Sequence, residues 1–236
     1  MTIAKRRARP GALTAQHWIA AAGAALEAGG IDAVAVEPLA QRLGVTKGSF
    51  YWHFANRDAL LQATLERWEA ECTEAVIAAV ARIEDPRERL AALIVEALTD
   101  TPEGDRAGDR QFVFSHAADL AIADAAADPI VQPILRRVTE RRIDYLEECY
   151  CGLGLSPAAA RHHALLAYAA YLGTLRLARE IPSRLPRDEA YLAYQRHLIA
   201  TLLPEKPERN QEQAQPLPAT TDVPDAGGER VTSERS

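Results

Sequence analysis

The 236-residue chain has few cysteines, few aromatic residues and no long apolar run. Its three cysteines, Cys72, Cys149 and Cys151, exclude a disulfide-based scaffold, and their odd number fits a reducing compartment better than secretion. The longest run without charge, residues 10–26, is shorter than the roughly 18 apolar residues of a membrane span and contains polar groups. We therefore expect a cytoplasmic protein with no membrane partner.

The N-terminus imitates a secretion signal, because Lys5, Arg6 and Arg7 precede a mostly apolar stretch at residues 18–26. The apolar side chains here recur at helical spacing, which the core of a signal peptide does not require. They are Leu13, Trp18, Ile19, Ala22 and Leu26. An amphipathic helix is the simpler interpretation.

Strand signals are nearly absent, since β-branched alternation occurs only at residues 31–36 while alanine and leucine dominate elsewhere. The sequence therefore predicts an all-α fold. Caps and helix breakers delimit about nine helices. Their expected ranges are 14–26, 37–43, 46–54, 57–83, 86–98, 110–126, 129–151, 157–181 and 188–203.

Charge is spread unevenly along the chain. Residues 1–57 hold seven basic and three acidic side chains, a net +4, whereas residues 58–203 carry −7 and residues 204–236 carry −3. A basic end on an acidic body suggests a nucleic-acid contact confined to that end.

Residues 39–54 have the anatomy of a helix-turn-helix. Leu39 and Leu43 lie four residues apart on one expected helix, and Phe50 and Phe54 four apart on the next. Each helix thus offers one narrow apolar face to a shared small core. Gly44 supplies the left-handed residue that the short turn between the helices needs.

The opposite face of the second of these helices carries polar and aromatic side chains. In a recognition helix the N-terminal residues meet base edges, while hydroxyls, N–H groups and cations bind phosphates. We therefore predict base contacts for Lys47, Gly48 and Tyr51. Phosphate contacts are predicted for Thr46, Ser49, Trp52, His53 and Arg57. The alternative, an aromatic core of a small bundle, is disfavoured because Phe50 and Phe54 already fill the inward side.

Residues 44–54 read GVTKGSFYWHF, and residues 56–61 read NRDALL. These stretches resemble the signature of the tetracycline-repressor (TetR) family. The resemblance is carried by motif over residues 14–62 and by architecture alone over 63–203. It implies a two-fold dimer that represses transcription and releases DNA when a small molecule enters the C-terminal domain. Family members often begin the first helix of the motif with a phosphate-binding Ser or Thr, a contact that Val36 cannot make through a side-chain oxygen.

The resemblance implies an all-α fold with two domains. The N-terminal one is a three-helix domain with the helix-turn-helix, and the C-terminal one is a helical ligand-binding and dimerisation domain. We expect a basic arm at residues 1–13, the DNA-binding domain at 14–60 and the helical domain at 61–203. Residues 204–236 are rich in proline and polar side chains, so a disordered tail is predicted there. The expected partners are a double-stranded palindromic operator, a second copy of the chain and a small-molecule effector.

The two last expected helices carry more apolar surface than one helix needs in a core. Two neighbouring stripes run along residues 157–181, and residues 188–203 add a third, so these helices of two subunits can form a four-helix bundle. The predicted interface residues are Leu166, Ala170, Gly173, Leu177, Tyr191, Tyr194 and Leu198. The alternative, that residues 157–181 form the central core helix of one subunit, stays open.

An effector pocket needs apolar walls and a few orienting polar groups. Eight side chains combine a large or apolar body with a polar tip or an aromatic face: Trp68, Cys72, Phe112, Phe114, His116, Tyr145, Tyr168 and Tyr171. Taken singly, each of these side chains fits a core position better than a ligand contact. The sequence does not identify the effector, and we predict no cofactor.

Metal-binding and catalytic patterns were also considered. Cys149 and Cys151, like His162 and His163, lack the i, i+4 spacing that places two ligands on one helix face, so no metal is predicted. The sequence contains no dinucleotide-binding, nucleophile-elbow or zinc-protease motif, so we predict that the protein has no catalytic activity. Two alternatives remain: a helical ligand-binding or protein-interaction module that does not bind DNA, and an all-α enzyme with its site in residues 63–203.

Overall fold

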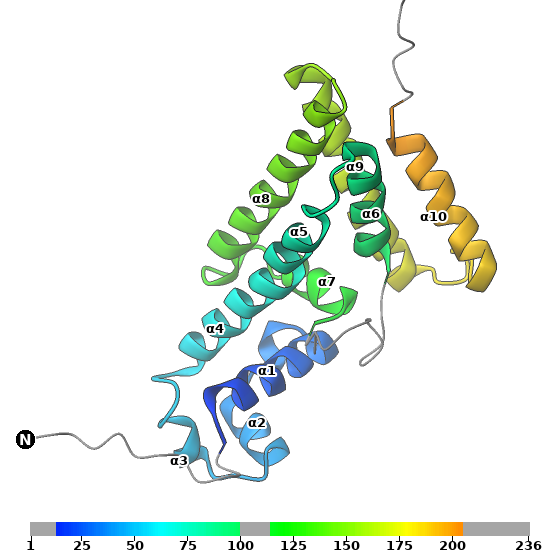
Figure 1. The fold of residues 1–236 in the computed structure, drawn as a ribbon. Coiled ribbons are helices and arrows are strands. Elements are labelled where there is room, and N and C mark those ends of the chain that lie inside the picture. The colour runs from blue at the N-terminus through cyan, green and yellow to red at the C-terminus, as the bar shows by residue number, and fades with distance from the viewer. Residues whose placement is uncertain (1–12, 100–113, 205–236) are drawn as a thin grey trace, which may run out of the picture. The chain divides into compact units, whose positions relative to one another are not determined.

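The computed structural model describes residues 13–99 and 114–204, and every regular element in these ranges is helical (Figure 1). The prediction of an all-α fold is confirmed. The α-helices are α1 (Ala15–Gly29), α2 (Val36–Arg42), α3 (Lys47–Phe50), α4 (Arg57–Glu69), α5 (Ala75–Val80), α6 (Pro86–Leu98), α7 (His116–Asp124), α8 (Val131–Gly152), α9 (Pro157–Glu180) and α10 (Asp188–Leu202). A π-helical turn, Ala70–Glu74, joins α4 and α5 into one rod that corresponds to the fourth predicted helix.

Capping residues set most helix boundaries where the sequence predicts them. The side chains of Asn56, Asp85 and Ser156 each accept a backbone N–H from the first turn of the following helix. Gly30, with φ +72°, ends α1, and Gly44, with φ +67°, follows α2. Residues other than glycine rarely adopt this left-handed backbone conformation. The short 3₁₀ turn Ile31–Ala33 occupies most of the stretch with β-branched alternation.

Two predicted boundaries are wrong by four residues or more. The helix expected from residue 110 begins only at His116, because Ser115 caps α7 and leaves Phe114 outside it; residues 110–113 lie outside the described ranges. The helix expected to reach residue 54 leaves regular α geometry after Phe50. The backbone N–H groups of Trp52 and His53 then donate three residues back instead of four, which is the tighter 3₁₀ pattern at a helix end. Asn56 has extended backbone, with φ −159°, and caps α4.

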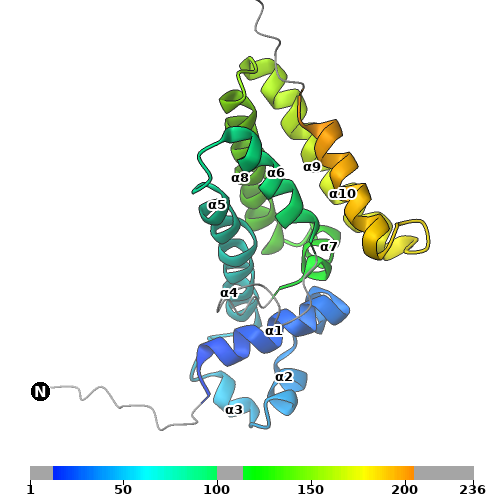
Figure 2. The ribbon, with the colours of Figure 1, turned by 45° about the vertical axis from the view of Figure 1, so that its right-hand side comes forward.

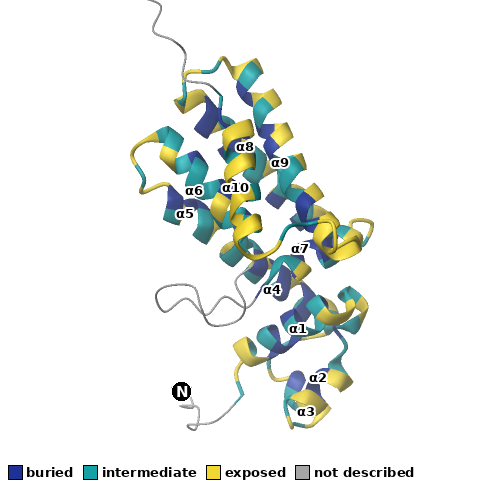
Figure 3. Ribbon diagram, turned by 90° about the vertical axis from the view of Figure 1, so that its right-hand side faces the viewer, coloured by how far each residue is buried: buried dark blue, intermediate teal, exposed yellow. Residues whose placement is uncertain are grey.

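Buried apolar side chains form two clusters. The N-terminal cluster joins α1–α4 to α7 and the first half of α8, and it includes Trp18, Phe50 and Trp68. The C-terminal cluster joins α5 and α6 to the second half of α8, α9 and the end of α10. Figure 2 shows α6, α9 and α10 side by side, and Figure 3 shows exposed residues along α10. The predicted domain boundary after residue 60 falls inside α4, and the N-terminal cluster extends across it.

Of the helices in the described ranges, none combines the length and the apolar character that crossing a bilayer requires. All but the first residue of the predicted tail at 204–236, and most of the predicted arm, lie outside these ranges.

Candidate DNA-binding interface and effector site

The helix-turn-helix core is built as its apolar spacing predicts. Leu39 of α2 and Phe50 of α3 are fully buried or nearly so, and the ring of Phe50 packs edge-on against Trp18 of α1 at a centroid distance of 5.2 Å. Phe54 stacks on Phe50 at 5.7 Å. Since α1 and α4 clamp this core, α3 is held with its other face outward.

The outward face of α3 presents the residues predicted to contact DNA. Thr46, Lys47 and Gly48 are exposed. Tyr51 is 57% exposed, although its ring packs edge-on against the buried Phe50, and Trp52 is 86% exposed. Large aromatic groups left in water over one short segment mark a surface that meets a partner. Ser49 and His53 lie at its edge, partly buried.

Arg57 lies differently from its predicted role as a phosphate contact. Its Nε donates to the backbone oxygen of Val34 at 2.8 Å, and one terminal nitrogen donates to that of Ile31 at 2.6 Å. Ile31 is the first residue of the 3₁₀ turn and Val34 directly follows it, so the guanidinium ties the start of α4 to the chain before α2. Its other terminal nitrogen lies 3.5 Å from Asp58. Two of its three nitrogens therefore donate to backbone carbonyls within the fold.

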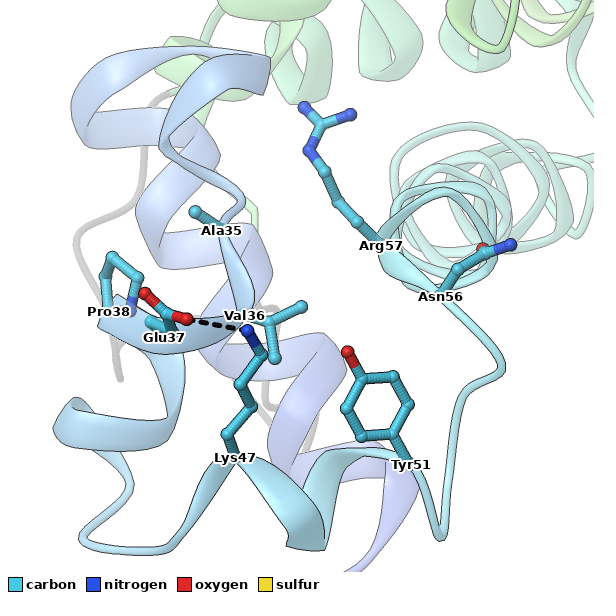
Figure 4. A pocket seen from close by; sticks show the side chains of 8 residues that line it. All are labelled: Ala35, Val36, Glu37, Pro38, Lys47, Tyr51, Asn56 and Arg57. Carbon is cyan, nitrogen blue, oxygen red and sulfur yellow. Dashed lines mark hydrogen bonds and ion pairs between the residues drawn. The ribbon is translucent and has the colours of Figure 1, made fainter.

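Glu37, which the sequence analysis did not single out, lies beside the predicted base-reading lysine. Lys47 Nζ donates to Glu37 Oε1 at 2.6 Å, between the start of α3 and the first turn of α2 (Figure 4). This contact lowers the pKa of Glu37 and raises that of Lys47, so both remain charged near neutrality. The pair lies over an open hollow of about 300 Å³. Its lining is Ala35, Val36, Glu37, Pro38, Lys47, Tyr51, Asn56 and Arg57.

A buried cation forms the centre of the helical body. Arg142 of α8 donates from Nε to Thr73 Oγ1 at 2.9 Å, from one terminal nitrogen to Asp119 of α7 at 2.9 Å and from the other to the Cys72 carbonyl at 3.2 Å. Burial by itself would lower the pKa of Arg142, but the Asp119 carboxylate, with Tyr171 and Tyr168, raises it overall. The π-helical turn, α7 and α8 therefore meet at one charged group.

Five of the predicted effector residues gather around this cation. The Arg142 guanidinium lies 5.2 Å from the ring centre of Trp68 and 5.9 Å from that of Tyr171. Tyr171 also neighbours His116, at 6.3 Å, and Tyr168, at 6.0 Å. The fifth is Cys72, through its carbonyl.

The other three predicted effector residues lie elsewhere or outside the described ranges. Phe114 is buried in the N-terminal cluster. Tyr145 belongs to the C-terminal cluster, and the Arg141 guanidinium lies over its ring, 5.7 Å from the ring centre. Phe112 is outside the ranges that the structure describes.

The interface residues predicted on α9 lie largely in the open. Leu166 and Leu177 are exposed, and open space surrounds the position that a Cβ of Gly173 would take. Ala170 packs partly against the C-terminal cluster. An exposed row of leucines along a long helix is the kind of surface that a second subunit covers.

The interface residues predicted on α10 are instead used within the chain. The Tyr191 hydroxyl donates to the Leu98 carbonyl of α6 at 2.8 Å, and the Tyr194 hydroxyl lies 3.0 Å from Thr174 of α9. Leu198 packs against the C-terminal cluster. These contacts arise because α10 lies on α6 and α9, which leaves Leu192 as the large apolar side chain that α10 exposes.

The cysteine and histidine pairs do not converge. Cys149 is buried while Cys151 is exposed, and the ring of His163 packs against Tyr150 at 5.1 Å. In the described part of the chain, no group of three side chains suited to a metal ion occurs.

Comparison with known proteins places this architecture in a family. A family profile described as "Bacterial regulatory proteins, tetR family" matches residues 19–64, which include α2, α3 and their exposed face. The HTH-type transcriptional regulator BetI 2 of Chromohalobacter salexigens is 31% identical over 186 residues, which span 76% of this chain and 84% of that protein. The chain belongs to the TetR family.

Two solved structures share the fold of this chain beyond the matched segment. A TetR transcriptional regulator from Legionella pneumophila superposes with a TM-score of 0.63 at 19% identity, covering 83% of this chain and all of that one. AibR, solved in complex with isovaleryl coenzyme A and operator DNA, superposes with a TM-score of 0.60 at 18% identity over 80% of this chain and 98% of its own. The family fold therefore includes the helical body as well as the DNA-binding motif.

Proposed function

We propose that this TetR-family protein is a sequence-specific transcriptional regulator, a repressor that a small-molecule effector releases from a palindromic operator. The observation that carries the proposal is the outward face of α3 and of the turn that follows it, where Lys47, Tyr51 and Trp52 are exposed to water while Phe50 and Phe54 pack in the core. A recognition helix in the major groove uses this division between an apolar inner face and a polar outer face.

The roles on this face follow from chemistry and position. Lys47 and Gly48 stand at the N-terminal end of α3, where a recognition helix meets base edges, and Tyr51 follows one turn later. Thr46, Ser49, Trp52 and His53 surround them and supply hydroxyl, indole and imidazole donors for phosphates. Arg57 acts in this scheme mainly by fixing α4 against the segment before α2.

The dimer is supported by the exposed leucines of α9. A helix-turn-helix protein places two recognition helices about one turn of DNA apart, and this spacing requires a fixed two-fold interface. Leu166, Gly173 and Leu177 offer an open, apolar strip for such an interface, and Leu192 of α10 is also exposed.

The effector site is supported by the surroundings of Arg142. Trp68 of α4 and Tyr171 of α9 bring aromatic faces to one buried cation, and His116 of α7 packs against Tyr171. A mostly apolar site with few polar groups is typical of ligand binding. Because α4 starts in the DNA-binding motif, a ligand that moves α4 here would also move α3.

Selection of binding sites from a random double-stranded DNA library by the full-length protein tests the proposal. Wild type should enrich a palindrome. Lys47→Ala should weaken binding to it by about 1–3 kcal/mol and relax the preference at one position of each half-site. Ser49→Ala, which removes a predicted phosphate contact, should weaken all sequences alike.

Two results would contradict these assignments. If Lys47→Ala and Ser49→Ala caused the same uniform loss, the division into base and phosphate contacts would be wrong. If wild type enriched no sequence, a helical module that does not bind DNA would replace the regulator.

Deleting residues 1–9, which hold four basic side chains, should flatten the salt dependence of binding without changing the selected sequence.

A further inference from the structure

Glu37 places a negative charge on the surface proposed to face DNA. It projects from the first turn of α2 and accepts the 2.6 Å bond from Lys47 described above (Figure 4). The side chains of Glu37 and Lys47 are 68% and 51% exposed. Ion pairs this exposed contribute little to folding, so the stability of the fold does not explain this one.

For DNA binding in general, this carboxylate is unfavourable. Affinity for any DNA sequence comes mostly from cations that neutralise phosphates and release counterions. A lysine already paired with a carboxylate adds no net positive charge to that interaction. The pair is useful only if it gains something from particular bases.

We propose that Glu37 is a specificity-determining residue that reads DNA jointly with Lys47, and that the two recognise one G·C base pair in each half-site. This inference rests on the proposed DNA-binding function. In the major groove guanine offers the acceptors O6 and N7, and cytosine offers its N4 amine. The Lys47 ammonium donates to guanine, and the Glu37 carboxylate accepts from cytosine.

The geometry suits a joint reading. An ammonium has three N–H donors, and Glu37 takes one, so two remain for guanine. The carboxylate likewise keeps acceptor sites beyond the one that Lys47 fills. Because their polar atoms are in hydrogen-bond contact, the two side chains meet adjacent base edges. Both side chains line the open hollow described above, so their polar atoms are accessible from outside the protein.

Glu37 discriminates chiefly by rejecting wrong bases. If the base pair is inverted, the carboxylate faces the two guanine acceptors, and if thymine replaces cytosine it faces O4. Each arrangement opposes two electron-rich groups with no proton between them. Specificity built on such repulsion also explains a charge that lowers general affinity.

The test compares wild type, Glu37→Ala, Lys47→Ala and the double variant as full-length proteins. Each undergoes binding-site selection from a random duplex library, followed by titration of the selected site and of a random duplex at several salt concentrations. Both single variants should lose the G·C preference at the same position, and their ratio of specific to random binding should fall about tenfold per half-site. The double variant should resemble the singles.

Glu37→Ala should also bind random DNA more tightly than wild type, with a steeper salt dependence, because Lys47 then acts on phosphates. Asp58→Asn is the matched control, since it removes an exposed carboxylate from the first turn of α4 without touching Lys47. It should leave every base preference unchanged. Thermal unfolding midpoints close to that of wild type would confirm that each variant folds.

An unchanged set of base preferences in Glu37→Ala would overturn the proposal. So would losses at different positions in Glu37→Ala and Lys47→Ala, because joint reading requires the same position. Failure of wild type to select any sequence would refute DNA binding itself and this inference with it. A selected palindrome that Glu37→Ala still reads fully would refute only the role of Glu37.

Discussion

Removing Asp119 should destabilise the protein strongly, because it leaves the Arg142 cation buried without its counter-ion. The side chains of Arg142 and Asp119 are only 14% and 7% exposed. Deleting one partner of a buried pair typically costs about 3–5 kcal/mol. Arg142 keeps its bonds to Thr73 and the Cys72 carbonyl, so we expect Asp119→Ala to fall at the lower end, about 3 kcal/mol.

A double-mutant cycle separates the pair from its surroundings. Arg142→Met keeps much of the side-chain volume without the charge, so adding it to Asp119→Ala removes the unpaired cation. The double variant should therefore be more stable than Asp119→Ala alone. Urea denaturation measures each free energy of unfolding, at one fixed protein concentration because a dimer's stability depends on it.

The exposed Arg136–Glu140 ion pair on the same helix, α8, is the matched control. Glu140→Ala should change stability by about 0.5 kcal/mol or less. The reasoning is refuted if Asp119→Ala costs less than about 1 kcal/mol, or if the effects of Asp119→Ala and Arg142→Met simply add.

Three further predictions concern the dimer, alkaline stability and the turn. Gly173→Leu fills space that is open within one chain, so a monomer should fold normally while sedimentation shows a weakened dimer; an intact dimer would place the interface elsewhere. Burial raises the pKa of Tyr150, whose hydroxyl donates to the Leu202 carbonyl, to about 12. Stability should therefore be complete below pH 10 and fall above it, by about 1.4 kcal/mol at pH 11, and urea titrations should show a smaller fall in Tyr150→Phe. Gly44→Ala should cost about 1–2 kcal/mol through its left-handed backbone alone, and Gly44→Asn less, as unfolding curves would show.

Local signals in the sequence were sufficient for the helices and the DNA-binding motif. The caps at Asn56, Asp85 and Ser156 act within one turn of chain, so they could be identified by residue type and position alone. The apolar spacing of Leu39 and Phe50 likewise fixed which face of each helix turns inward.

Interactions between distant segments could not be predicted in the same way. Arg57 looked like a free cation because its carbonyl partners lie 23 and 26 residues earlier in the chain. The Arg142 centre joins residues that are about 70 and 23 positions away. Even the Lys47 contact with Glu37 crosses a turn. Each depends on which helices pack together, and residue spacing along one helix carries no such information.

The N-terminal cluster has a consequence for engineering. Its buried side chains pass without interruption from Trp18 and Phe50 in the DNA-binding motif, along α4, to Trp68, Ala118 and Ile134 in the helical body. A fragment cut after residue 60 would expose the inner face of α1 and lose most of α4, so we expect it to be a poor graft onto another protein. Chimaeras that exchange DNA specificity should instead replace only the outward residues of α2 and α3.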